Sequence, residues 1–318
     1  PYLREMGVDY LYLNPIFEAH SNHRYNTADY LNVDPLLGTN EEFEVLCREA
    51  AKYGIGIVLD GVFSHTGSDS RYFNREGRYG DGGAYRDPNS PYRSWYDFDP
   101  KYKGGYRSWW GFETLPEVNE ENPSYVEFIT GEGGVIDTWL RRGAAGFRLD
   151  VADELPDDFI EKIRAAVKRV SPEKFLLGEV WEDATTKYGF GQRRTYLLGK
   201  GLDSVMNYPF KNAVLDFVKG KPAEQAMGEI LSICEHYPAP AMDTALNFLS
   251  THDTERALTV IADEPANGRG REWQSGRCVT GEAYEEGMLR LRMAYAIIYT
   301  LPGVPCLYYG DEIGMQGY

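Results

Sequence analysis

Seven short apolar segments, separated by helical patterns, restrict the possible folds of this chain more than any other feature. Each segment is bounded by turn residues, as strands are. The segments are VDYLYLNP (8–15), GIGIVLDG (54–61), AAGFRLDV (144–151), KFLLGEVW (174–181), LDSVMNYP (202–209), ALNFLSTHD (245–253) and VPCLYYGDE (304–312). Continuous apolar strands that alternate with helices are typical of a parallel sheet covered by helices.

The intervening helices are indicated by apolar periodicity and by capping signals. Residues 39–54, 157–170 and 285–303 show this pattern, and Thr39 with Glu42 matches a capping box. An open, doubly wound sheet is the alternative, but no GxGxxG motif follows any strand. The chain opens with PYLREMG, which resembles the end of a helix. We therefore predict an α/β fold, a (β/α)8 TIM barrel whose first strand lies outside this sequence.

One connection is much longer than the others. Between Ser64 and Leu115 the sequence is rich in Gly, Asp, Ser, Arg and aromatic residues and shows no helical period. Long irregular connections in compact domains are often functional. We predict barrel strands 2–3 in residues 1–64, an inserted loop-rich subdomain in residues 65–115, and barrel strands 4–8 in residues 116–318.

Composition excludes two classes of partner. The 318 residues include 33 basic and 49 acidic residues, a formal charge of −16, and no basic cluster, so nucleic-acid binding is not expected. No apolar run reaches the roughly 20 residues of a membrane-spanning helix. The four cysteines are scattered without a CxxC pair, which favours free, buried thiols over a disulfide framework or a zinc site.

Ionisable side chains gather where the predicted strands end. In (β/α)8 barrels the loops at the carboxyl ends of the strands carry the active site. The residues at these ends are Asp60, His65, Arg148, Asp150, Glu179, His252 and Asp253. Each alone has a structural explanation, and Arg148 with Asp150 could be a simple ion pair. Together they indicate a functional site, because clustered ionisable groups perturb one another.

Three chemistries compete for this cluster. HSNH (20–23) with His65 could bind zinc, but the spacing is that of a loop rather than of a helical HExxH motif. Ser/His/Asp catalysis lacks a GxSxG elbow. Paired carboxylates fit best: Arg148 would keep Asp150 ionised for attack, and Glu179, close to Trp181, would stay protonated to deliver a proton. No metal or cofactor is required by this chemistry.

Several motifs together resemble the α-amylase superfamily, glycoside hydrolase family 13. They are SNHRYNTADY (21–30), DGVFSH (60–65), LPEVN (115–119), GFRLDVADE (146–154), GEVW (178–181), FLSTHD (248–253) and GVPCLYYGDE (303–312). The resemblance implies a nucleophile at Asp150, an acid/base at Glu179 and a stabilising carboxylate at Asp253. We expect substrate contacts from Arg148, His65, His252, Tyr25, Trp181 and Asp60. For Trp109 and Trp110 we expect local packing instead.

Within that superfamily, VADE (151–154) resembles the VANE of neopullulanases, cyclomaltodextrinases and maltogenic amylases. The resemblance implies retaining hydrolysis of α-1,4 bonds, with α-1,6 activity also expected, in maltooligosaccharides, cyclodextrins, pullulan or starch. An α-glucanotransferase and a silent glucan-binding homologue are the alternatives. The subgroup implies a cytoplasmic location and homodimerisation of the full-length protein. Ser64 stands where the family often has a calcium-binding Asn, so the usual structural calcium site is not expected to be complete.

Overall fold

The computed structural model describes residues 1–318, which divide into two compact units. The first comprises Pro1–Glu179 with Lys200–Leu202, and the second comprises Val180–Gly199 with Asp203–Tyr318. Each of the seven segments predicted as strands contains one, so this prediction is confirmed. No helix of the chain is both long enough and apolar enough to cross a lipid bilayer.

A parallel sheet lies at the centre of the first unit. Its strands, in spatial and chain order, are β1 (Tyr10–Tyr12), β4 (Gly56–Gly61), β5 (Gly146–Leu149) and β6 (Phe175–Gly178). All four residues of β5 are buried. A Cβ at Gly146 would lie 2.3 Å from the carbonyl oxygen of Phe175, so only glycine permits this close approach of β5 and β6.

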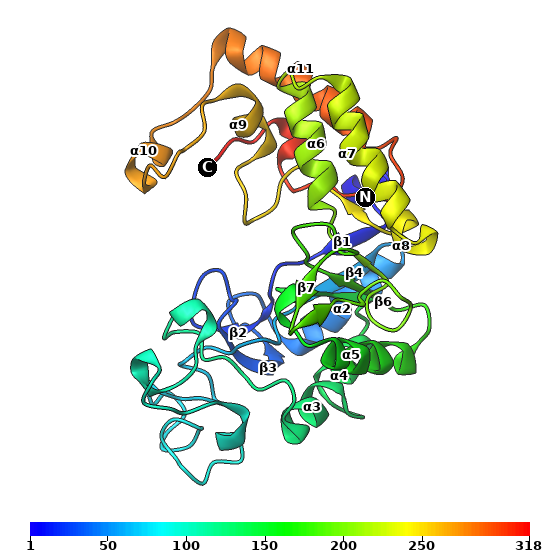
Figure 1. The fold of residues 1–318 in the computed structure, drawn as a ribbon. Helices are drawn as coiled ribbons and strands as arrows, with labels where there is room; N and C mark the ends of the chain where they lie inside the picture. The colour runs from blue at the N-terminus through cyan, green and yellow to red at the C-terminus, as the bar shows by residue number, and fades with distance from the viewer. The chain divides into compact units, whose positions relative to one another are not determined.

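Four helices of the first unit pack on this sheet or on one another (Figure 1). They are α2 (Asn40–Ala51), α3 (Pro123–Thr130), α4 (Val135–Arg141) and α5 (Asp157–Val170), and a short helix, α1 (Tyr2–Glu5), precedes β1. Helix α5 has the predicted bounds. The predicted capping box of α2 is also present, because Thr39 Oγ1 accepts from the amide of Glu42 while the Glu42 carboxylate accepts from the amide of Thr39.

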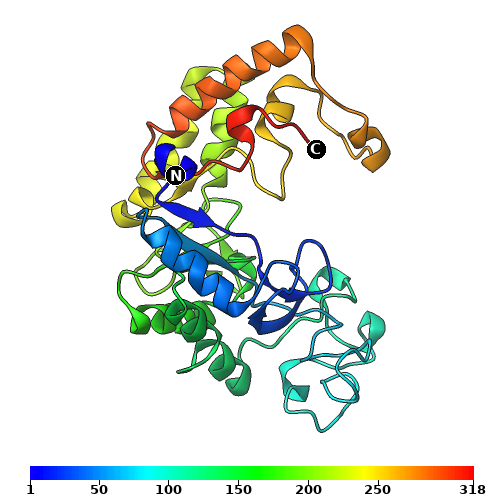
Figure 2. The ribbon, with the colours of Figure 1, turned by 180° about the vertical axis from the view of Figure 1, so that it is seen from behind.

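The long connection after β4 contains no α-helix, as predicted. Figure 2 shows it as an irregular path, and its only helical segments are 3₁₀ turns. These are η1 (Arg93–Trp95), η2 (Lys103–Gly105) and η3 (Trp109–Gly111). Aromatic rings form its core: Tyr72 is buried, packs on Trp95, and its hydroxyl accepts from the amide of Tyr30. Tyr30 belongs to an antiparallel ribbon, β2 (Phe17–Ala19) with β3 (Thr27–Val33), that the sequence analysis did not predict.

The second unit contains the remaining strands and helices. Its strands are β7 (Tyr188–Gly189), β8 (Gln192–Arg193), β9 (Ser204–Val205), β10 (Leu246–Asn247) and β11 (Val304–Pro305). Its helices are α6 (Tyr208–Val218), α7 (Ala223–His236), α8 (Ala239–Asp243), α9 (Ala257–Ala262), α10 (Arg271–Ser275), α11 (Gly281–Ile298) and the 3₁₀ turn η5 (Asp311–Ile313). Strands β10 and β11 pair in parallel, and Met206, directly after β9, bridges in parallel to Leu246. Helices α6 and α7 lie side by side (Figure 1).

The cysteines are all free, but the expectation that they are buried is wrong for most of them. Only Cys47, on the inner face of α2, is fully buried, whereas Cys278 is exposed. Cys234 and Cys306 are half-buried. The apolar neighbours of Cys306 in the sequence suggested an interior strand, but β11 already ends at Pro305.

Candidate active site

The carboxyl ends of three neighbouring strands bring charged side chains together in the first unit. Asp60 on β4 pairs in register with Arg148 on β5. Asp150 follows β5 directly, and Glu179 follows β6 directly. Because parallel strands end at one edge of a sheet, residues far apart in the sequence converge there.

The guanidinium of Arg148 is the centre of this cluster. The side chain is fully buried, and its Nη1 lies 2.7 Å from Asp60 Oδ1 and 2.9 Å from Asp150 Oδ1. Its Nη2 lies 2.9 Å from Glu179 Oε2. Arg148 and Asp150 therefore share one face of the strand, as the two-residue period predicts. One buried cation contacts three carboxyl groups, which is more than a simple structural ion pair requires.

Hydrogen bonds from the backbone and from two tyrosines fix the carboxylates. The amide of Val151 donates to Glu179 Oε2 at 2.8 Å, and Val151 has a left-handed backbone with φ of +40°. This conformation is unfavourable for a β-branched residue and is often found at functional sites. The hydroxyls of Tyr12 and Tyr25 each donate to Asp60 Oδ2 at 2.8 Å.

Tyr12 is a site residue that the sequence analysis missed. It is the last residue of β1 and pairs with Val58, two residues before Asp60. Its place at a strand end was readable from the segment VDYLYLNP, but a tyrosine in an apolar run resembles ordinary core. Its hydroxyl contact with Asp60 depends on the pairing of β1 with β4.

Burial dominates the electrostatics of Asp150. Desolvation raises the pKa of this carboxyl well above its ordinary value, and the charges of Asp60 and Glu179 act in the same direction. Arg148 lowers it, as the sequence analysis predicted, but does not outweigh burial. For Arg148 itself, burial opposes the charged form, yet Asp60 and the other neighbours raise its pKa above the ordinary value. With three carboxyl groups around one guanidinium, the cluster favours retention of a proton.

A stability test follows from the raised pKa of Asp150. The folded protein binds the proton more tightly than the unfolded chain, so this contribution to stability is present at low pH and is lost as the pH rises through the folded-state pKa. Asp150→Asn removes the buried charge and should stabilise the fold at pH 7 by about 1–2 kcal/mol. Thermal unfolding at pH 7 and pH 4 measures this, and the gain should shrink at pH 4. A variant less stable than the parent at pH 7 would contradict the assignment.

The side chain of His65 is more deeply buried than substrate binding alone would require. It is 2% exposed, and burial lowers the pKa of its imidazole to about 4. Its Nε2 lies 3.0 Å from the carbonyl oxygen of Tyr25, and its Nδ1 lies 2.9 Å from Ser64 Oγ. The carbonyl can only accept, so Nε2 carries the proton and Nδ1 accepts from the serine. This neutral imidazole connects the end of β4 to the loop that carries Tyr25.

The other predicted site residues belong to the second unit. His252 Nε2 lies 3.1 Å from Asp253 Oδ2. Trp181 stacks on Tyr208 with ring centroids 4.1 Å apart and remains 43% exposed. The convergence of Asp253 with Asp150 and Glu179 stays a prediction.

The histidines considered for zinc do not form a cluster. His20 lies beside Tyr79, and His23 stacks on Tyr25. Across residues 1–318 no group of three His, Cys, Asp or Glu side chains has an arrangement that could hold a metal ion. Ser64, which the resemblance places where an asparagine often binds calcium, is buried with its hydroxyl against His65.

Comparison with known proteins identifies the family of this chain. The family model described as "Alpha amylase, catalytic domain" matches residues 1–318. This chain belongs to the alpha-amylase family. An amylopullulanase of Thermoanaerobacterium saccharolyticum is 37% identical over 99% of the chain and 26% of that protein. Neopullulanase 2 of Thermoactinomyces vulgaris is 34% identical over 100% of the chain and 48% of that protein.

A solved structure agrees with this assignment. The cyclic alpha-maltosyl-(1→6)-maltose hydrolase of Arthrobacter globiformis superposes with a TM-score of 0.82 at 30% identity, covering 99% of this chain and 64% of that one. The alpha-amylase catalytic domain is a (β/α)8 barrel, so the predicted fold class is confirmed. The chain spans about a quarter of the amylopullulanase and about half of the neopullulanase.

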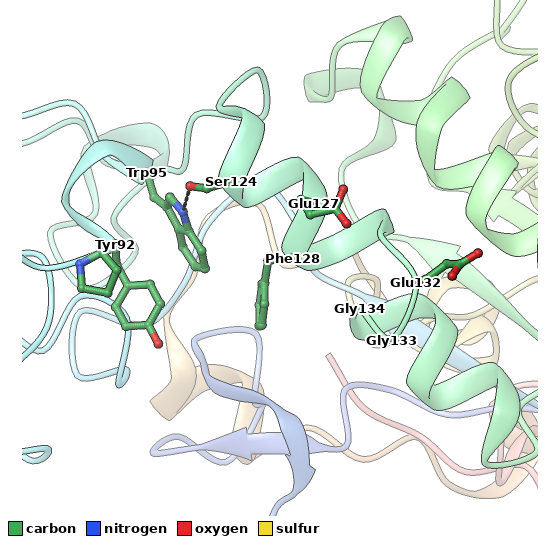
Figure 3. A pocket seen from close by; sticks show the side chains of 9 residues that line it. Tyr92, Trp95, Ser124, Glu127, Phe128, Glu132, Gly133 and Gly134 are labelled. Carbon is green, nitrogen blue, oxygen red and sulfur yellow. Dashed lines mark hydrogen bonds between the residues drawn. The ribbon is translucent and has the colours of Figure 1, made fainter.

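A separate hollow in this alpha-amylase domain lies between η1 and α3 (Figure 3). Its volume is about 400 Å³, and it is lined by Pro91, Tyr92, Trp95, Ser124, Glu127, Phe128, Glu132, Gly133 and Gly134. None of the predicted catalytic residues lines it. Its aromatic rings pack on one another, and Trp95 Nε1 donates to Ser124 Oγ at 2.8 Å.

Proposed function

We propose that this chain is the catalytic domain of a retaining glycoside hydrolase that cleaves α-1,4 glucosidic bonds, and also α-1,6 bonds, in α-glucans. One observation carries the proposal: the buried guanidinium of Arg148 contacts both Asp150 and Glu179 at 2.9 Å. Two carboxyl groups held by one cation at adjacent strand ends suit double displacement, which needs one ionised and one protonated carboxyl. We assign the ionised role to Asp150 and the protonated role to Glu179, as the resemblance to the family's motifs implies.

In the proposed first step, a carboxylate oxygen of Asp150 attacks the anomeric carbon. The bond from that carbon to the leaving oxygen breaks, and Glu179 transfers its proton to the leaving oxygen. In the second step Glu179 takes a proton from water, the water oxygen attacks the anomeric carbon, and Asp150 leaves as a carboxylate. Each step inverts the anomeric carbon, so the product retains its configuration.

The surplus of negative charge around Arg148 supports this chemistry. The transition state resembles an oxocarbenium ion, and buried carboxylates stabilise positive charge that develops beside them. We assign the same role to Asp253, held by His252 in the second unit. We assign substrate contacts to Tyr25, whose hydroxyl is fixed by Asp60, and to the exposed ring of Trp181. We also propose that residues 65–115 form a loop-rich subdomain inserted between barrel strands 3 and 4.

The substrate class follows from the relatives. Their names refer to amylopullulanase, neopullulanase and cyclic alpha-maltosyl-(1→6)-maltose hydrolase activities, all on α-glucans. An α-glucanotransferase would use the same residues, and a silent glucan-binding protein would use only their affinity. Homodimerisation and a cytoplasmic location of the full-length protein stay predictions.

Product release from cyclodextrin, pullulan and soluble starch tests the proposal. We expect the parent protein to release reducing sugars from at least one of them and Glu179→Gln to release them about 1,000-fold more slowly at the same concentration. Cleavage of cyclodextrin or pullulan would support the neopullulanase-like assignment. A folded parent protein that is inactive on all three would contradict hydrolysis and favour the silent binder.

A further inference from the structure

An exposed row of aromatic rings borders the catalytic cluster. In the long connection after β4, Trp110 is 76% exposed and Phe112 is 55% exposed. Trp109 stacks on both, with ring centroids 5.3 Å from Trp110 and 6.1 Å from Phe112. Trp110 also has a left-handed backbone, with φ of +50°. The rings do pack locally, as the sequence predicts. A ring that is three-quarters exposed, on an unfavourable backbone, is also typical of a binding role.

One carboxylate holds the two indoles in place. Trp109 Nε1 donates to Glu154 Oε2 at 2.7 Å, and Trp110 Nε1 donates to Glu154 Oε1 at 2.8 Å. Both indole N–H groups are therefore already used within the protein. What remains available on Trp110 is the flat face of its ring, which is fixed in orientation before any ligand arrives.

The row is connected to the active-site residues through two short paths. Glu154 ends the 3₁₀ turn η4 (Ala152–Glu154), which directly follows Val151, whose amide donates to Glu179. On the other side, the ring of Trp109 lies 5.5 Å from that of His65. The aromatic row is thus held by the turn that directly follows Val151, whose amide contacts the proposed acid, and the acid must face the leaving oxygen.

We propose that Trp109, Trp110 and Phe112, fixed by Glu154, form an aromatic platform that binds a glucose ring of the α-glucan on the leaving-group side of the cleaved bond. This rests on the proposed function. The apolar faces of a sugar stack on flat rings that lose little entropy on binding. Stacking on a ring face does not distinguish the positions of the sugar hydroxyls. The platform therefore contributes affinity for the glucan rather than specificity for one linkage. Glu154 is a positioning residue in this arrangement.

Two substrates that differ only beyond the cleaved bond test the platform. Maltotetraose places sugars on both sides, whereas α-maltosyl fluoride has a single atom on the leaving side. In Trp110→Ala the ratio of kcat/KM for maltotetraose to kcat/KM for the fluoride should fall about tenfold, the size expected for loss of one stacked ring. This ratio does not depend on the fraction of active enzyme, so a general loss of folding does not change it.

Three further variants sharpen the experiment. Trp110→Phe retains a ring and should stay within about twofold of the parent ratio. Glu154→Gln retains an acceptor for one indole and should fall between the parent and Trp110→Ala. Tyr53→Ala removes an exposed ring before the opposite end of β4 and should leave the ratio unchanged. An unchanged ratio in Trp110→Ala, or an equal loss on both substrates, would overturn the platform.

Failure of the hydrolase proposal can be distinguished from failure of the aromatic platform. If the parent protein cleaves neither substrate, the hydrolase proposal fails. Calorimetric titration of the parent and of Trp110→Ala with maltohexaose then decides on the platform. Weaker binding by the variant would support it, and equal binding would overturn it.

Discussion

Glu179→Gln is expected to lower kcat on pullulan or maltooligosaccharides by about 1,000-fold, within the range that loss of a general acid produces. On α-maltosyl fluoride the same variant should still complete the first step, because fluoride leaves without needing a proton. The second step would be slow, since glutamine cannot take the proton from water. A covalent maltosyl adduct should therefore accumulate, and intact-protein mass spectrometry would detect it.

Asp150→Asn is the matched control for that experiment. It lacks the proposed nucleophile, so it should form no adduct with the fluoride while being at least as stable as the parent at pH 7. An adduct in the Asp150 variant would assign the nucleophile elsewhere. Equal losses of Glu179→Gln in kcat/KM, which reports the first step, on the fluoride and on pullulan would show that Glu179 is not the proton donor.

Arg148→Ala is expected to cause the largest loss of stability. Arg148 is fully buried and contacts Asp60, Asp150 and Glu179, so its removal leaves three buried carboxyl groups without their cation. Breaking a buried pair in this way costs about 3–5 kcal/mol. Urea unfolding at pH 7 and pH 5 should show that the loss is smaller at pH 5, because protonated carboxyls need no cation.

Arg148→Lys separates charge from geometry. Lysine keeps one positive charge but lacks the planar guanidinium, whose two terminal nitrogens contact the carboxyl groups of Asp60, Asp150 and Glu179. We expect it to recover part of the stability at pH 7 while kcat/KM remains at least about 100-fold below the parent, as for misplaced catalytic groups. If Arg148→Ala unfolds like the parent at pH 7, the guanidinium does not neutralise the cluster. If Arg148→Lys restores full activity, charge alone is sufficient.

Local sequence patterns determined much of the secondary structure of this protein. All seven strand segments, the bounds of α5 and the capping box of α2 could be predicted, because helix and strand periods and capping signals act over a few residues. The common face of Arg148 and Asp150 also follows from the two-residue period of a strand. The ribbon of β2 and β3 was missed because its irregularly paired strands carry no clear alternation.

Only the tertiary structure decided how distant residues meet and how strongly burial acts on them. Asp60 and Arg148 are separated by 88 positions, and Trp109 and Glu154 by 45, so their contacts depend on strand pairing and on the path of a long loop. The sequence suggested that Arg148 sets the charge of Asp150, but burial outweighs that neighbour. Desolvation depends on all the atoms that surround a group, and the folded chain as a whole places those atoms.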